Sequence, residues 1–303
     1  MDYKSKIILI AGPTASGKSN FAVKLARKIN GEIVNADSMQ VYRQFHILTA
    51  RPKKYDKKNI KHYLYGFQDA KKKFSTGKWL GLAVKKIKEI RKNNKVPILV
   101  GGTGLYFKSL TEGLVKIPTI SIKNRKKIRR LQKYVGQKKF YKMLIDLDPY
   151  VKNKINYNDV QRSIRAYEVK KFTKLSITEW FKKTKIFFDE DNFIKIYIDF
   201  TRENLLDRIK KRVDIMFKDG AILEVKRFNK LNVTKAHSVN KVIGIEEIRK
   251  YLNGEWNLDQ TKERILIKTR QYAKRQTTWA RGQMISWQKI HFKDITSALK
   301  KFK

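Results

Sequence analysis

The residues best suited to chemistry stand near the start of the chain. Eight consecutive residues match the pattern G-x-x-x-x-G-K-S/T at every fixed position, namely Gly12, Pro13, Thr14, Ala15, Ser16, Gly17, Lys18 and Ser19. The two glycines allow the backbone to turn with its N–H groups inward, which forms a nest for a polyphosphate. Lys18 would neutralise phosphate oxygens, and the Ser19 hydroxyl would be a ligand of a bound Mg²⁺. The alternative is a glycine-rich turn that binds no ligand.

A single carboxylate is expected beside this loop. Asp37 follows the apolar segment 31–36, and ligands of open α/β sheets collect at the carboxyl ends of the strands. The apolar segment 96–100 ends instead in Gly101, Gly102, Thr103 and Gly104, without an acidic residue. In nucleotide kinases, an acidic residue at the end of such a later strand often holds Mg²⁺. The pattern therefore favours a diphosphate held as a leaving group, with Asp37 free to accept a proton.

These residues require a parallel sheet to position them. Apolar segments at 7–11, 31–38, 96–100 and 193–199 predict strands, and apolar residues at helical spacing predict helices at 20–30, 79–94 and 202–219. Residues 44–78 are predicted to be mostly irregular. We expect an α/β fold with a P-loop NTPase-like parallel sheet flanked by helices, formed by residues 1–115 and 195–303. Residues 116–194 are predicted to be a mostly helical, strongly basic insertion domain.

The composition points to a polyanionic partner. The 303 residues include 71 Lys and Arg against 27 Asp and Glu, which gives a formal net charge of +44. Such an excess favours nucleic acid over a neutral small molecule, although a lysine-rich composition can also be a property of a whole proteome. The absence of cysteine excludes disulfides, thiolate metal sites and a cysteine nucleophile. No apolar run has the length of a signal peptide or a membrane span, so a cytoplasmic protein is expected.

Several motifs resemble those of the tRNA dimethylallyltransferase family, also called IPP transferases. The segment DSMQVYR at 37–43, which follows GPTASGKS at 12–19, carries the first similarity. Further similar segments are GGTGLYF at 101–107, NDVQR at 158–162, KVIGI at 241–245 and TRQYAKRQTTWAR at 269–281. This chain departs from the family at a few positions, among them Tyr157 in place of a proline and Ile245 in place of a tyrosine. The resemblance extends from residue 7 to about residue 285.

The resemblance implies a reaction and a set of site residues. The family transfers an isopentenyl-type group to an adenine beside the anticodon, which implies dimethylallyl diphosphate and the tRNA anticodon arm as substrates, Mg²⁺ as cofactor and a monomeric enzyme. The implied catalytic residues are Asp37, Lys18 and Arg212, with the diphosphate on the backbone amides of residues 14–19. The implied tRNA-binding residues are Asp37, Ser38, Met39, Gln40, Thr103, Arg125, Gln161, Arg162, Ser163, Ile164, Arg165 and Lys241.

Other interpretations stay open at this point. Thr103 could be the N-cap of a following helix, and Arg212 could be a surface residue. The loop at 12–19 is shared with ATP-binding proteins, so a small-molecule kinase is one rival function. A non-catalytic RNA-binding protein with a residual P-loop is the other. His46 and His62 are given no catalytic role, because isolated histidines are more often structural or surface residues.

Overall fold

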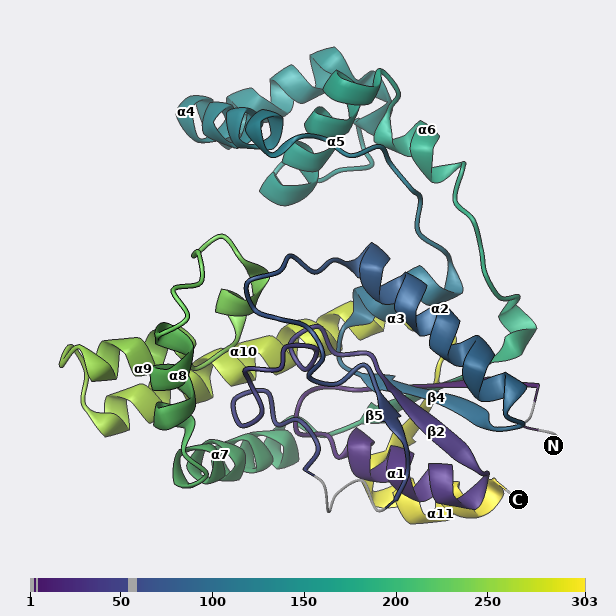
Figure 1. The fold of residues 1–303 in the computed structure, drawn as a ribbon. Coiled ribbons are helices and arrows are strands. Elements are labelled where there is room, and N and C mark those ends of the chain that lie inside the picture. Colours follow the sequence, from purple (N-terminus) through teal and green to yellow (C-terminus); the bar gives the residue numbers. More distant parts are fainter. Residues whose placement is uncertain (1–2, 4, 54–58, 303) are drawn as a thin grey trace. The chain divides into compact units, whose positions relative to one another are not determined.

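The computed structural model describes residues 3, 5–53 and 59–302. The chain divides into two compact units (Figure 1), the first formed by Met1–Thr111 with Phe188–Lys303 and the second by Glu112–Phe187. The expected insertion, residues 116–194, overlaps the second unit. Part of the segment 44–78 that the sequence predicts to be irregular, residues 54–58, lies outside the described residues.

The first unit is built on one parallel sheet, as predicted. Its six strands lie in the order β3-β2-β4-β1-β5-β6, and each neighbouring pair is parallel. The strands are β1 (Ile7–Ala11), β2 (Gly31–Asn35), β3 (His62–Tyr63), β4 (Val96–Gly101), β5 (Phe193–Asp199) and β6 (Gln288–His291). Strands β1, β2 and β4 are buried along their whole length, which is typical of parallel strands covered on both faces.

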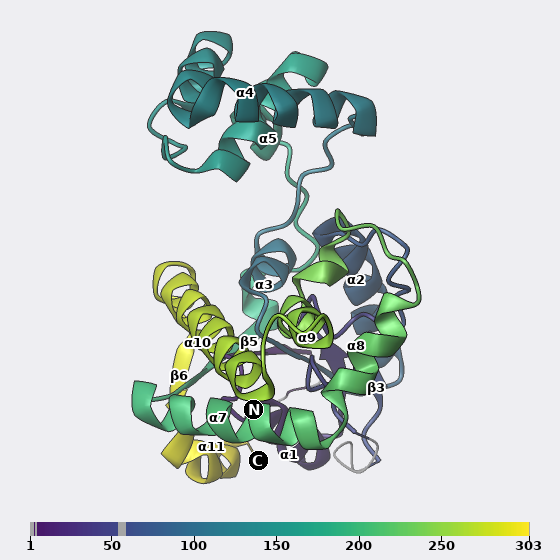
Figure 2. The ribbon, with the colours of Figure 1, turned by 90° about the vertical axis from the view of Figure 1, so that its left-hand side faces the viewer.

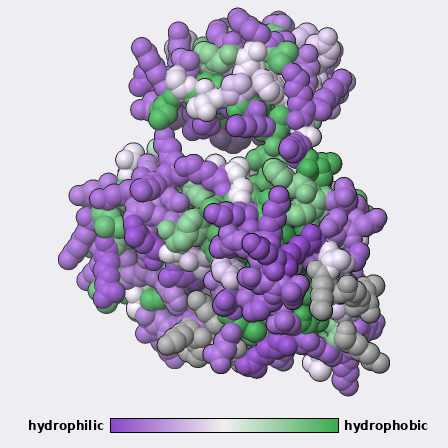
Figure 3. All heavy atoms as spheres, turned by 45° about the vertical axis from the view of Figure 1, so that its right-hand side comes forward, coloured by the Kyte–Doolittle hydropathy of each residue, from purple (hydrophilic) through white to green (hydrophobic). Residues whose placement is uncertain are grey.

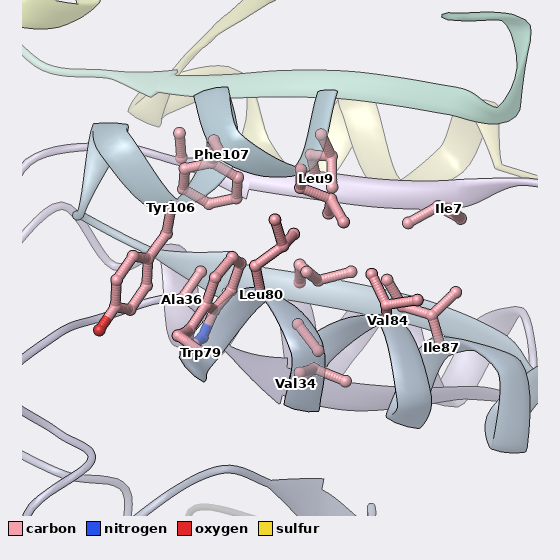
Figure 4. Close-up of a cluster of buried hydrophobic side chains, with 14 of the residues drawn as sticks. Ile7, Leu9, Val34, Ala36, Trp79, Leu80, Val84, Ile87, Tyr106 and Phe107 are labelled. Atoms are coloured by element: carbon pink, nitrogen blue, oxygen red, sulfur yellow. The ribbon is translucent and has the colours of Figure 1, made fainter. Parts of the chain in front are cut away.

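Helices cover both faces of this sheet. Side chains of β1 alternate between the faces: Ile8 and Ile10 pack with α1 (Lys18–Lys28) and α11 (Ile295–Lys301). Ile7 and Leu9 pack with α2 (Thr76–Lys92) and α3 (Gly104–Thr111) on the other face, where Trp79 is fully buried (Figure 4). The two layers fix the loops at the carboxyl ends of the strands.

Four further helices complete the described part of the first unit (Figure 2). They are α7 (Arg202–Lys218), α8 (Ala221–Asn229), α9 (Ile245–Leu252) and α10 (Leu258–Gln283). Helix α10 packs against α3, α7 and α9. The helix predicted from residue 202 is confirmed, and its apolar residues Leu205, Ile209, Val213 and Met216 are buried as their spacing predicts. Short 3₁₀ helices lie at η3 (Glu190–Asn192), η4 (Ser238–Lys241) and η5 (Phe292–Asp294).

The second unit is helical. It consists of α4 (Ile122–Leu147), the 3₁₀ helix η2 (Pro149–Val151), α5 (Val160–Thr173) and α6 (Ile177–Phe181). Helix α4 is kinked at Gly136, whose φ of 77° lies in the left-handed region that favours glycine. Phe140 and Leu144 of α4 pack against Val169 of α5 in a core of this unit's own. The unit therefore has the hydrophobic core that an independent domain requires.

Most side chains on the face shown in Figure 3 are hydrophilic. Among the described residues, no helix combines the length and the apolar character needed to span a bilayer.

Candidate active site

The loop at residues 12–19 connects β1 to α1, as the strand–loop–helix pattern predicts. Ala15 and Gly17 have φ values of 64° and 80°, so the backbone turns through the left-handed region twice. Helix α1 begins at Lys18, and its first N–H groups have no partner within the helix. Those N–H groups and the positive end of the helix dipole favour an anion at this place.

The loop and Asp37 open into one cavity of about 500 Å³. This cavity is the one that the expected chemistry requires, because a donor held by the loop would lie beside the carboxylate. Its lining consists of Thr14, Ala15, Gly17, Lys18, Ser19, Asp37, Ser38, Met39, Gln40, Leu48, Thr49, Ala50, Arg208, Arg212, Val213, Met216, Lys241, Val242, Ile243, Thr269, Tyr272 and Arg275. Polar, cationic and apolar side chains thus line the same cavity.

Lys18 lies among other charges of this cavity. Burial lowers the pKa of its ammonium group to about 8, with the nearby Asp37 opposing the shift and Arg212 adding to it. Its Nζ atom donates a hydrogen bond of 3.1 Å to the carbonyl oxygen of Pro13. With a pKa of about 8 this ammonium group is still mostly protonated at neutral pH, and a bound anion would raise its pKa again.

Two arginines of α7 reach the loop from the other side. Arg212 Nη1 donates a 2.6 Å hydrogen bond to Thr14 Oγ1, and Arg208 Nε donates a 2.7 Å bond to the carbonyl oxygen of Ala15. The Arg212 Nε atom is buried, and no group of the described residues forms a hydrogen bond with it. The sequence reasoning missed Arg208, although its position one helical turn before Arg212 was a usable signal.

The Asp37 carboxylate is held in one orientation by the backbone that follows it. Its Oδ1 atom accepts hydrogen bonds from the amides of Met39, at 2.8 Å, and Gln40, at 3.3 Å. Within the described residues these are the hydrogen bonds that the carboxylate accepts, so Oδ2 is left for a ligand. The amide of Asp37 in turn donates to Asn35 Oδ1 at 2.9 Å. The turn after β2 therefore aims the carboxylate before any substrate binds.

A second cavity, of about 290 Å³, adjoins the first. Thr103 lines this second cavity, while Ser38, Tyr272 and Arg275 line both. The Thr103 hydroxyl accepts a 2.9 Å bond from the amide of Ser38 and donates a 3.2 Å bond to the Ser38 hydroxyl. It thus bonds to the residue beside Asp37 and not to the first turn of α3. Burial, and to a lesser extent Asp37, raise the pKa of the Tyr272 hydroxyl above its usual range, so this hydroxyl stays a hydrogen-bond donor.

One expected phosphate ligand is already engaged. The amide of Thr14, counted among the amides of residues 14–19 for the diphosphate, donates a 2.8 Å hydrogen bond to Gln276 Oε1. The amide of Ser16 is engaged as well, since it donates a 3.3 Å hydrogen bond to the carbonyl oxygen of Pro13. The amides that remain for a phosphate are therefore those of residues 15 and 17–19.

The family model described as IPP transferase matches residues 40–283. The chain belongs to the IPP transferase family. It is 59% identical to the tRNA dimethylallyltransferase of Pelagibacter ubique (strain HTCC1062), over 100% of this chain and 97% of that relative. Identity to the tRNA dimethylallyltransferase of Rickettsia massiliae (strain Mtu5) is 43%, over 98% of this chain and 83% of the relative. The family resemblance that the motifs predict is confirmed.

Solved structures of similar sequence share the fold of this IPP transferase. A full-length tRNA isopentenylpyrophosphate transferase from Bacillus halodurans has a TM-score of 0.71 and 30% identity, over 98% of this chain and 95% of that one. A eukaryotic dimethylallyltransferase acting on tRNA has a TM-score of 0.80 and 28% identity, over 96% and 75% of the two chains. Residues 12–19 and Asp37 precede the matched range 40–283, and they lie within the span that the Pelagibacter ubique relative covers.

The second unit of this IPP transferase carries the other expected tRNA-binding residues. Gln161 and Arg162 are exposed on α5, and the Arg162 side chain is 73% exposed. Arg125 and Arg165 both lie beside the buried carboxylate of Glu168, at 3.3 and 3.6 Å.

Two of the expected tRNA-binding residues do not face solvent. Ser163 is fully buried and Ile164 is 6% exposed, within the core of the second unit. These side chains face inward because α5 buries one side against α4. Their assignment to tRNA binding stays a prediction.

Proposed function

We propose that this chain is a tRNA dimethylallyltransferase, which transfers a dimethylallyl group from dimethylallyl diphosphate to N6 of the adenine immediately 3′ of the anticodon. The observation that carries the proposal is the single cavity lined by both the P-loop and Asp37. Relatives named tRNA dimethylallyltransferase that match along the whole chain support the same activity.

The donor would bind through its diphosphate. The amides of residues 15 and 17–19, the ammonium group of Lys18 and the guanidinium of Arg212 would bind it at the loop end of the cavity, and Arg208 adds a third cation there. The apolar side chains of Val213 and Met216 line the same cavity. This wall would accept the five-carbon tail, because apolar lining with a few placed polar groups is the common composition of small-molecule sites.

The residues present are compatible with Mg²⁺. This ion prefers oxygen ligands and usually binds through one or two protein oxygens together with substrate phosphates. Ser19 lines the cavity next to Lys18, and its hydroxyl group is such a protein oxygen. Ser19 would therefore hold the ion against the diphosphate, where the ion would neutralise charge on the leaving group.

The chain's own residues supply the proton transfer. The adenine N6 atom attacks C1 of the allyl group, the C1–O bond breaks, and diphosphate departs with the bonding electron pair. Asp37 Oδ2 accepts the proton that N6 loses, a contribution typically worth about 10²- to 10⁴-fold in rate. Since negative charge develops on the departing diphosphate, the preorganised amides and cations of the loop supply the larger share.

The RNA would be bound by both units. An enzyme that modifies a base must take that base out of its stack, and Ser38, Met39, Gln40 and Lys241 line the cavity that would receive the adenine. Thr103 would contribute from the adjoining cavity. Gln161, Arg162, Arg125 and Arg165 of the second unit would contact unstacked bases and phosphates of the anticodon arm.

We propose a monomer as the active form, because one chain provides every residue assigned above. A tRNA substrate is consistent with a cytoplasmic location.

The test is to incubate the protein with an anticodon-arm RNA and dimethylallyl diphosphate, without ATP, and to measure the mass of the RNA. We expect a gain of one five-carbon unit and the release of diphosphate. If the RNA mass does not change while ATP is hydrolysed in a parallel reaction, the kinase alternative holds. Binding of the RNA with neither reaction would instead support a non-catalytic RNA-binding protein.

A further inference from the structure

Gln276 of α10 links two loops that the motifs treat as separate. Its Oε1 atom accepts the 2.8 Å hydrogen bond from the amide of Thr14, and its Nε2 atom donates a 2.9 Å bond to the carbonyl oxygen of Gly102. One side chain thus connects the P-loop after β1 with the glycine-rich loop after β4. Both ends of its amide group are engaged.

The two linked loops would serve different substrates of the proposed reaction. The P-loop would hold the diphosphate of the donor, and the glycine-rich loop lies on the side of the adenine. Thr14 belongs to the diphosphate nest, and its hydroxyl is the atom to which Arg212 donates. Gly102 directly precedes Thr103, whose hydroxyl bonds to Ser38 beside Asp37. The amide group of Gln276 therefore adds a direct link between the two loops, beyond the pairing of β1 with β4 that precedes them.

The Gln276 amide group is tightly packed against the backbone of Gly102. A Cβ atom at Gly102 would collide with Gln276 Nε2, so the amide lies directly against the glycine backbone. Only a side chain with an acceptor oxygen and a donor group on one planar end satisfies both backbone partners at once. Glutamine has this arrangement, and so does protonated glutamic acid. Methionine has neither group at a similar length.

We infer that Gln276 is a positioning residue, which holds the diphosphate nest in register with the acceptor side of the site so that C1 of the donor meets N6 of the adenine. It is not one of the groups that would touch the reacting atoms. Small displacements of reacting groups cost much of the advantage of proximity, with about 10²-fold for 1 Å as a guide. The inference rests on the proposed function, and it adds a requirement that neither the P-loop pattern nor Asp37 contains.

The first test is Gln276→Met, which keeps the side-chain length and removes both hydrogen bonds. We expect kcat to fall by about 10- to 100-fold, while KM for the RNA and for dimethylallyl diphosphate stays within about threefold, because the binding groups remain. The matched control is Gln271→Met, the same substitution at an exposed position of α10, which should leave kcat within about twofold. A Gln276→Met enzyme with the wild-type kcat would overturn the inference.

A second variant keeps the test decisive if Gln276→Met folds poorly. The carboxylate that Gln276→Glu introduces still accepts a hydrogen bond from the Thr14 amide, but it repels the carbonyl oxygen of Gly102 until it is protonated. The ratio of variant to wild-type kcat should therefore rise as the pH falls from about 6 to about 4, toward the pKa of about 4.3 that is usual for a glutamate carboxyl group. Other titratable groups of this region, Tyr197, Tyr272 and Arg275 in the second cavity and Arg212 at Thr14, are common to both proteins.

The outcomes separate this inference from the proposed function. A ratio that does not change with pH means that Gln276 only fills space, and it overturns the positioning role. A wild-type protein that transfers no dimethylallyl group would overturn the proposed function itself. A wild-type protein that does transfer it, with a Gln276→Met variant as active as wild type, would overturn only the role of Gln276.

Discussion

Arg212 Nη1 donates a 2.6 Å hydrogen bond to Thr14 Oγ1 across 198 residues of sequence. This contact holds α7 against the P-loop. In the proposed function, the Arg212 guanidinium would lie on one side of the bound diphosphate and α1 on the other. A P-loop alone binds many polyphosphates, and in the proposed function this added cation would stabilise the departing diphosphate. Four predictions about the site and the second unit can be tested directly, and a fifth tests the central claim.

We expect Arg212→Ala to lower kcat/KM for dimethylallyl diphosphate by about 10²- to 10³-fold, the usual loss when a preorganised donor to a developing anion is removed. Arg212→Lys should recover only part of this loss, because an ammonium group lacks the planar fork of the guanidinium. Steady-state kinetics with varied donor measure both effects.

The control for these variants is Lys211→Ala, which removes a neighbouring exposed cation of α7 and should change kcat/KM by no more than about twofold. Equal losses for the two alanine variants would mean that net charge, and not the position of Arg212, supports donor binding.

The pH dependence of donor binding should report Lys18. Burial lowers the pKa of its ammonium group to about 8, and kcat/KM reflects the free enzyme. Lys18 loses its proton as the pH rises through this pKa, so kcat/KM for the donor should fall by up to about tenfold per pH unit above it. The bound diphosphate favours the charged form, so kcat should stay level over the same range. A level kcat/KM up to about pH 10 would contradict this role.

RNA binding should depend strongly on salt. If about five phosphates of a single-stranded loop are neutralised, the logarithm of the binding constant should fall with the logarithm of the salt concentration at a slope near −3.5. Filter binding or fluorescence anisotropy with an anticodon-arm RNA, at several salt concentrations, measures this slope. A slope near zero would exclude the proposed electrostatic contacts.

The core of the second unit should be needed for RNA binding and dispensable for donor binding. Phe140 is fully buried, and the centroid of its ring lies 5.1 Å from the centroid of the Tyr167 ring. Phe140→Ala should therefore lower the free energy of unfolding of this unit by about 3–5 kcal/mol. We expect the affinity for RNA to drop while inorganic diphosphate still stabilises the first unit in a thermal melt.

Tyr134→Ala is the matched control for this aromatic truncation, since Tyr134 lies on the same helix and is 90% exposed. It should leave the stability of the second unit unchanged within about 0.5 kcal/mol. Loss of diphosphate binding in Phe140→Ala would show that the two units do not fold independently.

The parts of the fold that follow from local pattern could be predicted from the sequence. The P-loop is specified within one strand–loop–helix segment, and the apolar run at 193–199 coincides with β5. Strand β6, Gln288–His291, has a single buried residue, so its apolar pattern is too weak to predict. Strand β3 has two residues and is defined by its partner β2 more than by its own sequence.

The site could be predicted only where a motif is contiguous. Asp37 follows its strand directly, whereas Gln276 lies 262 residues from Thr14, and no local pattern indicates that the two are bonded. The burial of Ile164, in contrast, follows from local pattern. Its place at helical spacing with Val160 and Tyr167 already predicts an inward face, and the structure buries it there.

The most direct test of the account is the rate of transfer in a single turnover by Asp37→Asn, with RNA and dimethylallyl diphosphate bound at saturation. Asparagine keeps the shape of the side chain but cannot take the N6 proton. The account predicts a rate lower by about 10²- to 10⁴-fold, with the affinity for RNA within several-fold of wild type. A single-turnover rate equal to that of the wild type would contradict the claim that Asp37 is the base of this site.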